Sequence, residues 1–107
     1  MNLNEYQEQA KRTLSNDQTF QENITMCALG LTGESGEFAD FVKKWRYHGH
    51  PLMTNDVIKE LGDILWYVAA TATVLGIDLN EIATVNLRKL RARYPDGFDS
   101  ERSINRT

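Results

Sequence analysis

Two pairs of acidic residues are the part of this sequence best suited to do chemistry. Glu34 and Glu37 are three residues apart, and Glu60 and Asp63 repeat that spacing. Residues three or four positions apart share one face of a helix, so each pair points to one side if its segment is helical. The four carboxylates are therefore the predicted reactive centre.

Both pairs lie where a buried stripe is expected. At about 100° per residue, Glu34 falls within the stripe defined by Phe38, Phe41 and Trp45. Glu60 and Asp63 border an apolar arc made of Val57, Leu61, Ile64, Leu65, Val68, Ala72 and Leu75. Burying an ionised carboxylate costs several kcal/mol unless it is paired or binds a cation, so a cation is expected between the pairs.

Oxygen ligands favour hard cations, and we expect Mg²⁺, with Mn²⁺ as a substitute. The only histidines, His48 and His50, follow the first acidic helix in a turn, which disfavours zinc and di-iron chemistry. Magnesium held by carboxylates leaves positions for substrate phosphates. The alternative is a buried network of ion pairs in which lysines such as Lys44 and Lys59 neutralise the acids.

Further along the chain, Asn86, Lys89 and Arg93 lie within about 60° of one another on a predicted helix. Cationic side chains of this kind bind polyphosphates, so these residues are predicted to contact the substrate. The alternative is a solvated basic patch that complements the negative end of the helix dipole.

Helical periodicity predicts that all of these candidate site residues lie on helices. It predicts helices over residues 4–14, about 20–47, about 54–75 and 78–94, with Asn4 and Thr54 or Asn55 as N-caps and Gly76 closing the third. Residues 99–107 are expected to be an irregular polar tail. Short connections favour antiparallel neighbours, so the prediction is one all-α domain over residues 1–107, a compact bundle of four main helices.

Composition narrows the classes of partner. Among 107 residues, 15 are acidic and 12 basic, giving a formal net charge of −3 without a long basic run. Duplex nucleic acid is therefore not an expected partner. No apolar run approaches the ~18 residues of a membrane span, and the single Cys27 and the polar start without a signal peptide indicate a cytoplasmic protein.

A second apolar strip on the third predicted helix suggests self-association. Trp66 and Ala70 lie on a side of that helix away from the apolar arc. Three other helices in so small a domain are not expected to cover both sides. We therefore expect a partner subunit to cover Trp66 in a homo-oligomer.

Three segments resemble the MazG-like nucleoside triphosphate pyrophosphohydrolases of the all-α group: residues 33–40 (GESGEFAD), 59–67 (KELGDILWY) and 86–98 (NLRKLRARYPDGF). The motif-bearing core covers about residues 20–98. The resemblance implies Mg²⁺ held by Glu34, Glu37, Glu60 and Asp63, which are then the catalytic residues. It also implies hydrolysis of a nucleoside triphosphate between the α- and β-phosphates, in a homodimer or homotetramer with sites close to subunit interfaces.

The same resemblance suggests two further substrate contacts. Tyr67 falls where relatives place an aromatic ring against the base, and Lys44 takes the position of a base-contacting tryptophan in dCTP-specific relatives. The lysine argues against a preference for dCTP. The expected role is removal of surplus or non-standard nucleotides. The alternatives are a catalytically inactive nucleotide-binding or regulatory module and a purely structural bundle.

Overall fold

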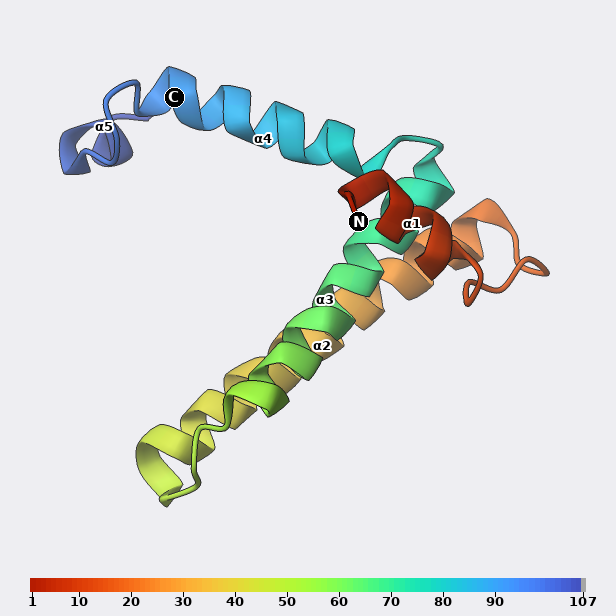
Figure 1. The fold of residues 1–107 in the computed structure, drawn as a ribbon, viewed down its shortest axis with the longest axis horizontal. Helices are drawn as coiled ribbons and strands as arrows, with labels where there is room; N and C mark the ends of the chain where they lie inside the picture. Colours follow the sequence, from red (N-terminus) through yellow and green to blue (C-terminus); the bar gives the residue numbers. More distant parts are fainter. Residues whose placement is uncertain (107) are drawn as a thin grey trace.

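A computed structural model describes residues 1–106, which form five α-helices and no strand (Figure 1). The helices are α1 (Leu3–Lys11), α2 (Phe20–His48), α3 (Thr54–Leu75), α4 (Leu79–Arg93) and α5 (Ser100–Ile104). The all-α prediction is confirmed, together with four main helices close to the expected positions. The fifth helix corrects the expectation of an irregular tail: the Asp99 side chain accepts a hydrogen bond from the Glu101 N–H and so starts a short helix.

Local capping chemistry explains the ends of the two long helices. Thr19 and Glu22 form a reciprocal capping box at the start of α2, and Gly49 ends that helix with φ of 74°. Gly76 ends α3 with φ of 73°, as expected for a residue without a Cβ in the left-handed region. The predicted N-caps were wrong, because Asn2 caps α1, and Met53 precedes α3 without a side-chain cap.

Helices α2 and α3 form a long antiparallel hairpin that is the main body of the molecule (Figure 1). Tyr67 lies across the contact, because a Cβ at Gly30 would collide with its ring. A glycine is required at this one point for the helices to approach. Gly33 and Gly36 have no described atom within 4 Å of their Cβ positions, so close helix approach does not explain them.

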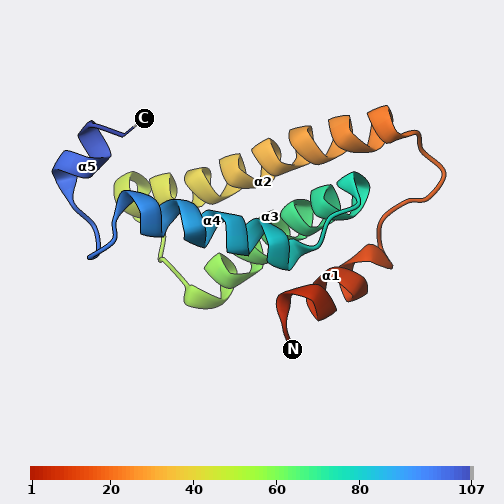
Figure 2. The ribbon, with the colours of Figure 1, turned by 90° about the horizontal axis from the view of Figure 1, so that it is seen from above.

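The expected compact bundle is not observed. Helix α4 leaves α3 at a bend of 104° and projects away from the hairpin (Figure 1). Helix α5 lies at the far end of α4 (Figures 1 and 2). The radius of gyration is 16.8 Å, whereas a globular chain of this length has about 13 Å. No single described helix is long and apolar enough to cross a membrane; only α3 and α4 taken together across their bend reach that length and composition.

Helix α1 holds the bend between α3 and α4. Gln7, which is buried, donates to the Thr73 hydroxyl (3.2 Å) and the Ile77 carbonyl (2.9 Å) and accepts from the Leu79 N–H (2.7 Å). The Asn4 side chain accepts from the Asn80 N–H at 3.1 Å. Asp78, the residue before α4, makes no side-chain capping bond, so α1 caps α4 from outside.

Part of the strip that was expected to meet a partner subunit is covered within the chain. Ala70 is buried, and the Trp66 indole N–H donates to the Thr13 hydroxyl at 2.8 Å, just after α1. Helix α1 packs across the end of the hairpin near the turn into α4 (Figure 1). Trp66 is nevertheless only half-buried, so its coverage by a partner subunit stays a prediction.

The buried core of this single chain is small. Its described apolar members are Cys27, Ala69, Ala70, Ala72 and Leu79. Part of the arc predicted to be buried on α3 is open instead, with Leu61 48% and Leu65 38% exposed. Ile58 lies on the same side of α3 and is 60% exposed, so an apolar stripe runs along the first half of that helix.

Candidate active site

The α2–α3 hairpin brings together three of the four predicted acids. Glu34 and Glu37 lie one turn apart on α2, and Glu60 faces them from α3. One carboxylate oxygen from each lies within 4.8 Å of the other two. Glu34 and Glu60 are half-buried, whereas Glu37 is exposed, so the cluster opens to solvent on the side of Glu37.

Two oxygens of this cluster are buried without any hydrogen-bond partner. They are Oε2 of Glu34 and Oε2 of Glu60, judged against all the residues that the structure describes. A buried polar atom without a partner is costly, and an ionised one more so. A cation at this position would satisfy both oxygens, so the donor set fits a hard divalent metal ion.

The electrostatics of the cluster agree with that fit. Burial raises the pKa of Glu34, and the charges of Glu37, Asp63 and Glu60 raise it further. Burial is also the largest cause that raises the pKa of Glu60, and the charges of Glu37, Asp63 and Asp56 raise it further. Like charges and desolvation both disfavour the ionised form, and a bound cation would remove the repulsion.

Asp63, the fourth predicted acid, lies near the cluster but is not one of the three residues whose oxygens lie within 4.8 Å of one another. It is exposed, and its charge acts on the pKa values of Glu34 and Glu60. Burial, and then the charge of Asp63, raises the pKa of Tyr6 on α1. Tyr6 was not predicted to lie near the acids, because periodicity within α1 carries no information about which part of α3 the helix crosses.

The cluster borders a hollow of about 440 Å³. The residues lining it are Gly33, Gly36, Glu37, Asp40, Phe41, Lys44 and Glu60. Because Gly33 and Gly36 carry no side chains, the surface of α2 is open beside the acids. Asp40 was not predicted as a site residue, although it continues the three-residue spacing of Glu34 and Glu37 along the same face. Phe41 was expected in the buried stripe of α2, and it lines the hollow instead.

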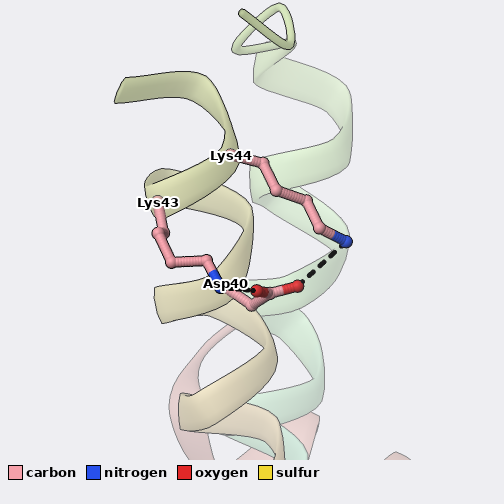
Figure 3. Close-up of polar contacts among 3 residues, drawn as sticks. All are labelled: Asp40, Lys43 and Lys44. Carbon is pink, nitrogen blue, oxygen red and sulfur yellow. Dashed lines mark ion pairs between the residues drawn. The ribbon is translucent and has the colours of Figure 1, made fainter. Parts of the chain in front are cut away.

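Lys44 belongs to this hollow, but its charge is already engaged. Its Nζ lies 3.0 Å from Oδ2 of Asp40, and Nζ of Lys43 lies 3.1 Å from Oδ1 (Figure 3). Both lysines lower the pKa of Asp40, Lys44 more than Lys43. Among the described residues, no side-chain nitrogen of a lysine or arginine lies within 4.0 Å of a carboxylate oxygen of the four predicted acids, so the expected alternative of a neutralising ion-pair network is not observed.

The other predicted substrate contacts lie away from the hollow. The Tyr67 ring packs on Gly30, one turn before Glu34 on α2, and meets Trp66 edge-on with ring centroids 4.9 Å apart. Lys89 and Arg93 line a separate hollow of about 620 Å³ beside α5, together with Asp99, Glu101, Arg102 and Arg106. Asn86 is exposed on α4 and lines neither hollow. Substrate contact by these four residues stays a prediction.

Comparisons with known proteins agree with the acidic motifs. The model of the MazG nucleotide pyrophosphohydrolase domain matches residues 21–98, which include all of α2, α3 and α4 except Phe20. The Gene 37 protein of Mycobacterium phage L5 is 36% identical over 89 residues, covering 79% of this chain and 78% of the phage protein. No solved structure matches the chain. With its acidic cluster inside the matched segment, the chain belongs to the MazG nucleotide pyrophosphohydrolase domain family.

Proposed function

We propose that this protein is a Mg²⁺-dependent nucleotide pyrophosphohydrolase that cleaves ribo- or deoxyribonucleoside triphosphates between the α- and β-phosphates. The observation that carries the proposal is the cluster of Glu34, Glu37 and Glu60, with two buried oxygens that no described residue satisfies. Family membership supports the same class of reaction. The proposed role is the removal of surplus or non-standard nucleotides in the cytoplasm.

Glu34, Glu37 and Glu60 would hold the Mg²⁺ ion, for which Mn²⁺ could substitute, and Asp63 would add a fourth carboxylate. When bound, the ion supplies Lewis-acid stabilisation of negative charge on the phosphate oxygens. The hollow beside Gly33 and Gly36 would seat the triphosphate chain. A carboxylate of the cluster accepts a proton from the attacking water, and the products are a nucleoside monophosphate and pyrophosphate.

The acidic hollow has one cation at its wall, Lys44, and that one is paired with Asp40. A triphosphate needs further positive charge, and Lys89 and Arg93 carry it on the projecting α4. In this chain they lie beside α5 and line a different hollow. We infer that α4 of a second copy brings these side chains to the site, so that the active form is a homodimer or homotetramer.

Surface area supports the association. The chain exposes 8101 Å², whereas a compact monomer of 12.2 kDa exposes about 6,100 Å². The excess of roughly 2,000 Å² is comparable with what one subunit loses in an obligate dimer. The stripe of Ile58, Leu61 and Leu65 is the apolar surface that a second copy of this chain would cover.

Product analysis tests the proposal. The protein is incubated with each common ribo- and deoxyribonucleoside triphosphate and Mg²⁺, and the products are separated by ion exchange. We expect monophosphate and pyrophosphate in equal amounts, and orthophosphate with diphosphate would contradict the choice of bond. Glu60→Gln should reduce kcat by at least about 100-fold, while Glu81→Gln, an acid in the first turn of α4, should not.

A further inference from the structure

A second, smaller hollow adjoins the acidic one where the α2–α3 hairpin turns. It has a volume of about 170 Å³ and is lined by Phe41, Lys44, His50, Pro51, Met53 and Asp56. Phe41 and Lys44 also line the acidic hollow, so the two share a wall. Ligand pockets that enclose a whole small molecule measure about 300–1,000 Å³, so this hollow suits one ring system that is part of a larger ligand.

The two hollows follow each other along the same two helices. Phe41 lies one turn beyond Glu37 on α2, and Asp56 lies one turn before Glu60 on α3. One helical turn advances about 5.4 Å. A ligand with phosphates at the carboxylates would therefore place a group joined by a short linker in the smaller hollow, and in a nucleotide that linker is the ribose.

The walls of the smaller hollow combine flat apolar surface with two side chains that can accept hydrogen bonds, the Asp56 carboxylate and the His50 imidazole. Phe41, Pro51 and Met53 offer an aromatic ring, a pyrrolidine ring and a thioether. The Asp56 carboxylate can only accept hydrogen bonds while it is ionised, and it takes part in no ion pair among the described residues. Lys44, the cation at this wall, is bound to Asp40 instead.

We propose that this hollow is the nucleobase subsite and that Asp56 makes it selective for guanine. The proposal rests on the function proposed above. Guanine presents two adjacent donors, the ring N1–H and the 2-amino group, which match the two oxygens of a carboxylate. Uracil and thymine present a single N–H flanked by two carbonyl oxygens, which the charge of Asp56 repels.

A pair of substrates that differ by one amino group tests the subsite. dITP lacks only the 2-amino group of dGTP, and kcat/KM is measured for both with wild type, Asp56→Asn and the control Glu81→Gln. Glu81 lies in the first turn of α4 as Asp56 does in α3, and it lines neither hollow. Wild type and Glu81→Gln should prefer dGTP by about 10- to 100-fold, as expected for a hydrogen bond to a charged group. Asp56→Asn should reduce that preference to within about threefold.

The ratio of the two substrates isolates the subsite from the reaction. Asp56 also acts on the pKa of Glu60, so its substitution changes the rate with both substrates, but that change cancels in the ratio. Binding of dGMP and dIMP, measured by calorimetry without turnover, separates the two proposals. Hydrolysis without a guanine preference overturns the subsite alone, and Asp56-dependent binding of dGMP without hydrolysis of any nucleotide overturns the proposed function alone. Absence of both binding and hydrolysis overturns both.

Discussion

Glu34 and Glu60 link the stability of the metal-free protein to pH. Burial and neighbouring carboxylates raise the pKa of both above the ordinary value of 4.5. The folded protein therefore binds protons at these groups more tightly than the unfolded chain. The stability that this contributes is fully present below pH 4.5 and is lost as pH rises through the raised pKa values.

We therefore expect the Tm of the metal-free protein to fall as pH rises above 4.5 through the raised pKa values. Asp40 and Glu22 have lowered pKa values, and their effect, of opposite sign, is confined to lower pH. Glu60→Gln should weaken the dependence of Tm on pH, and Glu81→Gln should leave that dependence unchanged. Differential scanning calorimetry measures both. A Tm that rises over this range in the wild type would contradict the raised pKa values.

Mg²⁺ should restore the folding stability that the metal-free protein loses at neutral pH. Only the folded chain brings Glu34, Glu37 and Glu60 together, so the ion stabilises the folded state by mass action, by about 2.7 kcal/mol at 100 times its Kd. The measurement is the Tm at pH 7.5 with and without millimolar Mg²⁺ or with a chelator. An equal Tm under both conditions would show that the cluster binds no ion.

Two glycines of α2 make a matched pair for testing the contact with Tyr67. Gly30→Ala puts a methyl group into the Tyr67 ring and should destabilise the fold by about 1–3 kcal/mol. Gly33→Ala meets no described atom and should stabilise α2 by up to about 1 kcal/mol through helix propensity. Denaturant unfolding measures both, and equal effects would mean that the ring does not lie against Gly30.

At the scale of the element, α1 holds the start of α4 through the side chains of Gln7 and Asn4. Gln7→Leu keeps the volume but leaves the Leu79 N–H and the Ile77 carbonyl without a partner, at a cost of about 1–3 kcal/mol. The first amides of α4 should then exchange hydrogen faster, as measured by mass spectrometry. Gln9→Leu, on the exposed side of α1, is the control and should change neither stability nor exchange.

At the scale of the whole molecule, we expect the open stripe on α3 to determine assembly. Leu61→Glu puts a charge on the surface proposed to meet a second copy, and it should dissociate the oligomer at micromolar concentration. The control Lys59→Glu lies on the same helix outside the stripe and should leave the assembly intact. Light scattering measures both, and a wild-type mass near 12.2 kDa in the active protein would overturn the interface.

The sequence by itself determined the four main helices and the acidic motifs, because these depend on residues close together in the chain. Capping residues, glycines and the three-residue spacing of Glu34 and Glu37 act within one or two turns. Contacts between distant segments were decided only by the tertiary structure. Gln7 lies 72 positions from Leu79, and it sets the bend that keeps α4 off the hairpin. Periodicity shows which face of a helix is apolar, but not what covers it. The Trp66 indole bonds to Thr13 of the same chain, while Leu61 on the same helix is half exposed.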